Sequence, residues 1–194
     1  MLNSDVHSTV SANQANISQA NINRAQGCFF LSIFGAAWLV TGHMLSGTVK
    51  MPVLAVIATV AVAMLAYALT IIRQNKPTAG DVDLEKKKAV KNTFLRINLI
   101  QWGIIIAALF TLNAINRVEW MIPLTLLVVG LHFLPLVKLF NSPEYIFTGA
   151  LLVIVALTYP WLDTRGSLTP IGPLLAGLTL WATTVYRLLI SKKK

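Results

Sequence analysis

Six long apolar runs, separated by short polar segments, dominate the pattern of hydrophobic and polar positions along the chain. They are Cys28–Ser46, Met51–Ile72, Ile97–Ile115, Trp120–Phe140, Tyr145–Leu162 and Leu168–Ile190. Each has about 18 to 23 residues, and a helix of that length crosses the ~30 Å hydrocarbon core of a bilayer. The pattern therefore predicts an all-α polytopic membrane protein, a bundle of six transmembrane helices.

The segments between the runs predict how these helices pair. The gaps within the pairs one–two, three–four and five–six are short, so each pair is expected to form an antiparallel hairpin. The rest of the chain divides into a polar N-terminal tail or surface helix over residues 1–27, the membrane domain over residues 28–190, and a basic tail over residues 191–194. The loop through Gly80 is expected to lead into a helix that continues into the third span.

Positive charge is distributed unevenly between the two sides of the predicted bundle. Of the 16 Lys and Arg residues, only Lys50, Arg117 and Arg165 lie in the first, third and fifth gaps. Loops rich in Lys and Arg stay on the cytoplasmic side of a membrane. Both ends of the chain are therefore expected in the cytoplasm, with Trp120 and Trp161 at the outer interface.

Composition narrows the classes of partner. The chain is 56% hydrophobic and only 12% charged, and its net charge of +9 is best explained by membrane topology rather than by nucleic-acid binding. Basic side chains next to a membrane attract anionic lipids. We expect headgroup contacts from a basic cluster, which consists of Lys86, Lys87, Lys88, Lys91 and Arg96.

Acidic side chains are placed in a way that argues against ion coupling. All seven are expected in tails, loops or helix ends, including Glu119 beside Arg117 and Glu144 at the start of the fifth run. Ion- and proton-coupled carriers usually need a carboxylate within the membrane. The sequence therefore weighs against that mechanism.

His132 is the one titratable side chain expected near mid-membrane. Pro135 follows it by one helical turn, frees the backbone carbonyl of Leu131, and predicts a kink. One interpretation is a proton-accepting or substrate-contacting imidazole. The other is a neutral histidine that holds the bundle together through a hydrogen bond to another helix.

The third run offers partners for that histidine. Asn98, Gln101, Asn113 and Asn116 fall near one line down a helix with 100° per residue. Such a face points inward, where it forms either a narrow polar path along helices three and four or hydrogen bonds between helices. Both interpretations remain open at this point.

No known catalytic or metal-binding motif is present, and Cys28 is the only cysteine. His43 lies near the outer end of its span and is too far from His132 to share a metal ion with it. The sequence predicts no cofactor, no metal site and no enzyme activity.

The stretch Gly130–Pro135, continuing through Phe140 and Pro143 to Tyr145 and Ala150, resembles a pattern in a family of small six-helix bacterial membrane proteins. That family has no assigned activity. The resemblance implies a bacterial cytoplasmic (inner) membrane and no particular chemistry.

Three functions are compatible with these features. The first is a non-enzymatic membrane protein that packs, senses or supports a partner, either another copy or another membrane protein. The second is a pore or transporter for small solutes that uses His132, Gln101 and Asn98, and the third is a membrane-embedded enzyme. The observation that would separate them most is whether water-sized space lies between the third and fourth helices at the depth of His132, and a dry core there would rule out the enzyme.

Overall fold

The computed structural model describes residues 2–75, 84–162, 164 and 166–191. For residues 2–17, 84, 86, 87 and 191 it describes the backbone only. Within these ranges all regular structure is helical, and six helices are long and apolar enough to cross a membrane. The predicted all-α, six-helix fold is confirmed. The chain is a multi-pass membrane protein.

The six helices match the six apolar runs, with three short 3₁₀ turns between them. The long helices are α1 (Leu2–Leu45), α2 (Met51–Gln74), α3 (Leu84–Ala114), α4 (Met121–Phe140), α5 (Glu144–Thr158) and α6 (Ile171–Ser191). The turns are η1 (Val118–Trp120), η2 (Tyr159–Trp161) and η3 (Gly166–Leu168). The helix expected ahead of the third span is confirmed, because α3 begins at Leu84, whereas the loop through Gly80 lies outside the described residues.

Helix α1 differs from the expected division of the chain at residue 27. It runs without a break from Leu2, and its candidate membrane span begins at Ser18. No proline interrupts this segment, and its Ile22 and Ala25 are buried in the bundle. The polar composition of the segment predicted a tail or surface helix separate from the span, but Ile22 and Ala25 pack into the bundle as the apolar residues of the span do.

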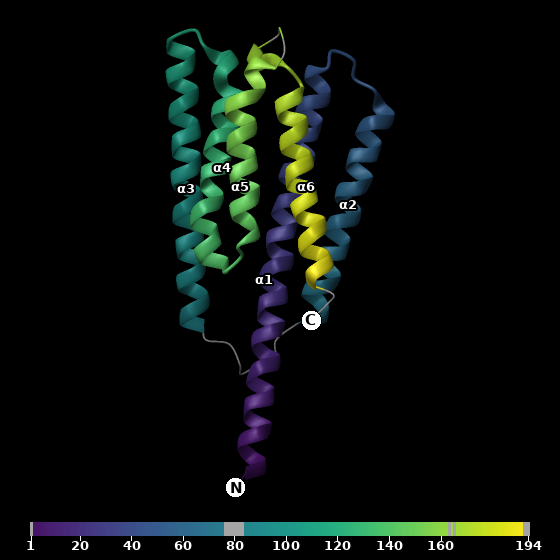
Figure 1. Ribbon diagram of the computed structural model, residues 1–194, viewed down its shortest axis with the longest axis vertical. Coiled ribbons are helices and arrows are strands. Elements are labelled where there is room, and N and C mark those ends of the chain that lie inside the picture. Colours follow the sequence, from purple (N-terminus) through teal and green to yellow (C-terminus); the bar gives the residue numbers. More distant parts are fainter. Residues whose placement is uncertain (1, 76–83, 163, 165, 192–194) are drawn as a thin grey trace.

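The helices form three antiparallel hairpins, α1–α2, α3–α4 and α5–α6, as predicted (Figure 1). We call the end that carries the three tight connections, near Lys50, Arg117 and Trp161, the hairpin end. The opposite end, where α6 finishes and α1 projects beyond the bundle, is the terminal end. Across the bundle the helices follow the order α3, α4, α5, α6, α1, α2, so α2 and α3 are its outer members.

Glycines bring the central helices together. A Cβ atom at Gly149 of α5 would lie 2.7 Å from the backbone oxygen of Gly130 in α4, and one at Gly177 of α6 would lie 2.8 Å from the oxygen of Gly35 in α1. Glycine, which has no side chain, allows helices in a membrane to approach each other this closely. The α4–α5 and α1–α6 contacts are accordingly the most extensive in the bundle.

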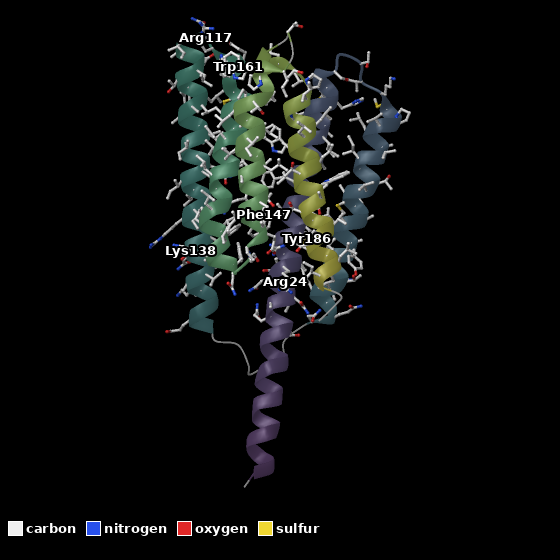
Figure 2. All side chains as sticks on the ribbon, viewed as in Figure 1. Arg24, Arg117, Lys138, Phe147, Trp161 and Tyr186 are labelled. Carbon is white, nitrogen blue, oxygen red and sulfur yellow. The ribbon has the colours of Figure 1, made fainter. Side chains whose placement is uncertain are left out.

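Large apolar side chains cover the outside of the bundle (Figure 2). Phe147 and Trp161, for example, are each 78% exposed. An apolar surface of this extent is stable only in lipid. The charged Arg117 lies at the hairpin end, and Arg24 and Lys138 lie toward the terminal end, outside the most apolar zone.

Candidate functional site

A cavity of about 610 Å³ lies between α1, α3 and α4, with Tyr145 of α5 and Leu180 of α6 at its back. This volume is within the range of ~300–1,000 Å³ that is common for small-molecule sites. Helices α1 and α3 flank the cavity but touch each other only sparsely. The rings of Phe30 and Phe94, whose centroids are 6.0 Å apart, bridge them.

Aromatic rings form one continuous part of the cavity wall. Phe94 of α3 contacts Phe140 of α4, with centroids 5.8 Å apart. Tyr145 of α5 contacts Phe140 at 6.4 Å and Phe133 at 5.3 Å. These rings come from three helices, so the wall exists only in the folded bundle and is apolar.

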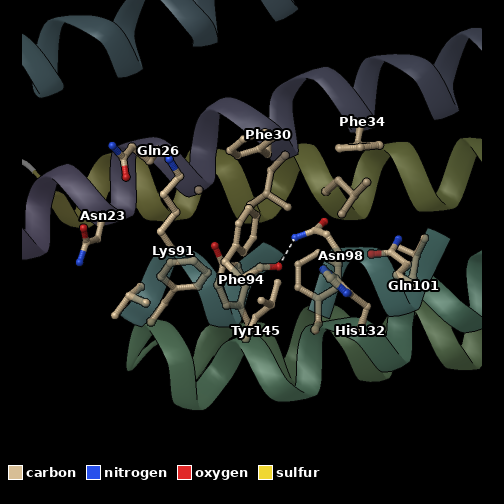
Figure 3. Close-up of a pocket in the computed structure, with 18 of the residues that line it drawn as sticks. Asn23, Gln26, Phe30, Phe34, Lys91, Phe94, Asn98, Gln101, His132 and Tyr145 are labelled. Atoms are coloured by element: carbon tan, nitrogen blue, oxygen red, sulfur yellow. Dashed lines mark hydrogen bonds between the residues drawn. The ribbon is translucent and has the colours of Figure 1, made fainter. Parts of the chain in front are cut away.

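The structure brings together three of the polar residues predicted to form a site. His132 of α4 and Asn98 and Gln101 of α3 all line the cavity, and Figure 3 shows them around one space. The Nδ2 atom of Asn98 donates to the Phe94 carbonyl oxygen at 2.8 Å, within its own helix. In the described part of the chain, no hydrogen bond joins His132 to either amide. The predicted alternative of a hydrogen bond between His132 and an amide of α3 is therefore not formed. The imidazole and the two amides face the space of the cavity instead.

The outer amides of α3 are not part of this site. Asn113 is exposed near the hairpin end, and Asn116, exposed as well, lies beyond the end of α3 with a left-handed φ of 53°. Neither lines the cavity. The polar face predicted along the whole of α3 thus contributes to the cavity only in its first half.

Pro135 lies inside α4, which continues through it to Phe140. Its side chain is exposed, whereas the neighbouring Leu136 is buried and lines the cavity. Because proline has no N–H to donate, the Leu131 carbonyl loses its partner in the helix. The proline thus loosens the backbone of α4 at the level of the cavity.

Polar residues gather at the part of the cavity that faces the terminal end. Gln19, Asn23 and Gln26 of α1 lie there together with Lys91 of α3. Figure 3 shows Lys91 reaching from α3 toward the helix that carries Gln26. Of the residues predicted to contact lipid headgroups, Lys91 alone lines the cavity. Lys88 and Arg96 are exposed elsewhere on α3, and the side chains of Lys86 and Lys87 lie outside the described residues.

Directly behind this cavity lies a buried ion pair that the sequence interpretation missed. Arg187 of α6 has a side chain only 1% exposed, and its Nη1 atom donates to Glu144 Oε1 of α5 at 2.9 Å. The guanidinium carbon also lies 4.4 Å from the centre of the Tyr145 ring. The sequence interpretation treated Arg187 as one of the charges that set the membrane topology, and it placed Glu144 at a helix end. Glu144 is indeed the first residue of α5, but the sequence interpretation did not predict that α6 packs the Arg187 guanidinium against it.

Small residues of α1 make room for this pair. A Cβ atom at Gly27 would lie 2.5 Å from the Tyr145 hydroxyl and 3.4 Å from Nη2 of Arg187. Cys28, next to it, is fully buried. Two features of the sequence could have indicated that Arg187 is buried. It is separated from the basic end of the chain by the apolar residues 188–190. It also shares a helix face with Leu180 and Thr184, which are buried.

Two aromatic residues predicted for the outer interface meet at the hairpin end. Trp120 and Trp161 are in contact, with ring centroids 6.3 Å apart. His43 lies at the same end and accepts a hydrogen bond at 2.8 Å from the backbone N–H of Lys50. This histidine therefore orders the α1–α2 connection, away from the cavity. No group of three or more His, Cys, Asp or Glu side chains is placed to hold a metal ion within the described ranges.

Comparisons with protein-family models, with curated proteins and with solved structures gave no match. The resemblance of the α4–α5 segment to small bacterial membrane proteins therefore stays a prediction from the sequence. What the protein does has to be argued from the cavity itself.

Proposed function

We propose that this chain is a non-enzymatic membrane protein that binds a small, largely apolar molecule in the cavity between α1, α3 and α4, and so senses it. The observation that carries the proposal is the 610 Å³ cavity itself, which has a mostly aromatic and aliphatic wall and a few converging polar groups. Such a combination is typical of small-molecule sites. A protein with a purely structural role would gain packing energy by filling this space.

The shape of the cavity favours entry from within the membrane. Its two flanking helices, α1 and α3, make few contacts with each other, and both outer faces are apolar. A molecule dissolved in lipid meets this side of the bundle directly. Binding from the bilayer thus requires no water-filled channel.

Passage of a small solute across the membrane is the second candidate. It is favoured by the convergence of His132, Gln101 and Asn98 on open space. However, the lining extends toward the hairpin end only to about Phe34, Trp102 and Val129, and a continuous path would have to pass Asn113, which lies outside it. Transport would therefore need a second conformation, whereas binding needs only this one.

Enzyme activity is the third and weakest candidate. Besides His132 the cavity is lined by Lys91, Tyr145, amides and hydrocarbon side chains, and within the described residues none of these forms a hydrogen bond with the imidazole. Acyl or phosphoryl transfer would call for a nucleophile or an acid within hydrogen-bond reach of it. Binding uses the same groups without that requirement.

For orientation we propose that the terminal end faces the cytoplasm, in a bacterial inner membrane. Among the described residues, the hairpin end carries Lys50 and Arg117, whereas most of the basic residues lie on the parts of the helices toward the other end. The positive-inside rule then assigns both ends of the chain to the cytoplasmic side.

Photochemical labelling tests the binding function. The full chain is placed in nanodiscs of phosphatidylcholine and exposed to two long-chain probes that carry a diazirine, one an alcohol and one a carboxylate. We expect adducts of at least one probe to concentrate on residues 19–34, 90–102 and 129–140, above the level on the exposed Val56 and Val62 of α2.

A filled cavity provides the matched control. Gln101→Trp places an indole in the cavity and should reduce these adducts, whereas Leu99→Trp places one on the same helix at a position that is 70% exposed and outside the lining. Even labelling of all lipid-facing helices by both probes, unchanged by Gln101→Trp, would overturn the proposal. Solute flux into liposomes that His132→Ala abolishes would support the second candidate instead.

A further inference from the structure

The wall of the cavity changes in character along the membrane normal. Near the terminal end it carries a positive charge, Lys91, and the amides of α1, among them Asn23 and Gln26. Beyond them come Phe30, Phe94 and Leu136, and then the level of Trp102, where the uncharged Asn98 and Gln101 and the imidazole of His132 lie among Leu31, Phe34 and Val129. The wall is therefore charged near the terminal end and mostly apolar farther in. A molecule that fits it has a charged head at one end and a largely apolar tail that points toward the middle of the bundle.

The charged residues of the cavity wall determine which charge the polar head of the ligand carries. Lys91 is the only charged residue among those that line the cavity, and none of its described neighbours forms an ion pair with it. Among the described residues, no acidic side chain lines the cavity. Glu85, the nearest described acid to Lys91 along the chain, is exposed and outside the lining, and Glu144 is paired with Arg187. A cation that has no acidic partner in the described part of the chain attracts an anion, and one ammonium group balances one negative charge.

The depth of the cavity matches an alkyl chain. Lys91 lies just inside the start of the candidate span Lys88–Ala114, where a long side chain reaches the headgroup level of the bilayer. Trp102 lies on the same helix near the centre of that span. At about 1.5 Å per residue the two are separated by roughly 16 Å of helix. A single extended hydrocarbon chain, parallel to the neighbouring lipids, occupies that depth.

We propose that the cavity binds a long-chain carboxylate, an amphiphile with one alkyl chain and one negative charge, with the carboxylate at Lys91 and the tail end near Trp102. This inference rests on the proposed binding function and specifies the class of ligand. It assigns Lys91 as the group that selects the head, and it assigns Phe30 and Phe94 as the rings that flank the tail where α1 and α3 part.

The orientation and the charge are tested together by quenching of Trp102 fluorescence. The full chain in dodecylmaltoside is titrated with a long-chain fatty acid that carries bromine on its terminal carbon, with the same acid brominated next to the carboxylate, and with the methyl ester of the first. Trp102→Phe identifies the share of quenching that belongs to this residue. We expect saturable quenching by the tail-brominated acid, and weaker quenching by the head-brominated acid and by the ester.

Two lysines on the same helix provide the matched variants. Lys91→Gln should weaken binding of the tail-brominated acid about three- to tenfold, the loss of one partly exposed charge contact, and should leave the ester unchanged. Lys88→Gln removes another exposed charge, one that does not line the cavity, and it should leave both unchanged. Both lysines have exposed side chains, and each variant is checked for folding by a melting temperature equal to that of the parent chain.

The outcomes separate this inference from the proposed function. Equal binding of acid and ester, or equal effects of the two lysine variants, would overturn the assignment of a carboxylate while leaving a neutral ligand in place. Stronger quenching by the head-brominated acid would reverse the proposed orientation, and tighter competition by a lysophosphatidate would replace the single charge with a phosphate. If no brominated compound quenches Trp102 in a saturable way, the binding function fails with it.

Discussion

Arg187 and Glu144 tie α6 to the first residue of α5 through a 2.9 Å ion pair, within a part of the bundle where the arginine has almost no exposed surface. The two residues are far apart in the sequence, and each lies toward the same end of the bundle. Because the guanidinium also rests against Tyr145, which lines the cavity, this pair fixes the back wall of the proposed binding site.

Removal of the acid should therefore destabilise the protein. Glu144→Gln leaves a buried guanidinium without its counter-charge, and we expect a loss of about 3 kcal/mol, seen as a lower apparent melting temperature in detergent. Glu119→Gln is the matched control. Its partner Arg117 is 3.6 Å away, and their side chains are 64% and 34% exposed, so the loss should stay below ~1 kcal/mol. Equal melting temperatures for the two variants would contradict the role given to the buried pair.

The α4–α5 contact should not tolerate a methyl group. In Gly149→Ala the new Cβ atom would lie 2.7 Å from the backbone oxygen of Gly130, so the two helices have to separate. We expect a loss of about 2 kcal/mol. Gly103→Ala is the control, because a Cβ atom at Gly103 meets nothing within 4 Å. Its melting temperature should equal or exceed that of the parent chain, since alanine favours helix over glycine. A stable Gly149→Ala protein would mean that α4 and α5 are not in close contact.

The end of α4 depends on a left-handed residue. Asn141 has a φ of 48° and donates its backbone N–H to the carbonyl of Val137, which closes the helix. Asn141→Ala should cost about 1 kcal/mol, because alanine lacks the short polar side chain that lets asparagine adopt the left-handed conformation, whereas Asn141→Gly should be as stable as the parent. Asn113→Ala, within the helical part of α3, is the control and should be close to neutral. Thermal unfolding of the four proteins ranks them, and an Asn141→Gly variant less stable than Asn141→Ala would be inconsistent with this cap.

Chemical labelling of single cysteines checks the proposed orientation. Cys28 is fully buried, so the parent chain should react little with a membrane-impermeant maleimide on intact cells. Thr48→Cys, in the α1–α2 connection at the hairpin end, should become labelled from outside, and Gln74→Cys, at the last residue of α2 and so at the terminal end, only after the cells are opened. Reaction of Gln74→Cys on intact cells would place the terminal end outside.

The sequence predicted the parts of this structure that depend on local pattern. The apolar runs and the short gaps at Lys50 and Arg117 determine six helices and their pairing, because a bilayer requires continuous apolar segments of a definite length. The convergence of His132 with Asn98 and Gln101 followed from helical periodicity together with the α3–α4 hairpin.

The remaining features arise from contacts between distant segments. The extensive packing of α1 on α6 places Gly27 against Tyr145 and Arg187, and nothing in the local pattern of any one helix specifies that neighbour. Arg187 was interpreted as one of the charges that fix the orientation of the helices in the membrane, because an arginine near a basic end of the chain usually has that role. The exposed position of Asn113 depends on how far α4 covers α3, which periodicity alone does not determine.

Helix α3 is held in the bundle by fewer neighbours than the central helices are. Not one residue of its candidate span Lys88–Ala114 is buried, and α4 with the short turn η1 supplies most of its contacts. Since hydrocarbon tails solvate leucine and isoleucine as well as a neighbouring helix does, little free energy is lost when such a helix tilts away. We therefore expect α3, which carries Lys91, to move more easily than the closely packed α1 and α6. A ligand that enters from the bilayer would then displace α3 alone, with α4 as the helix to which it stays attached.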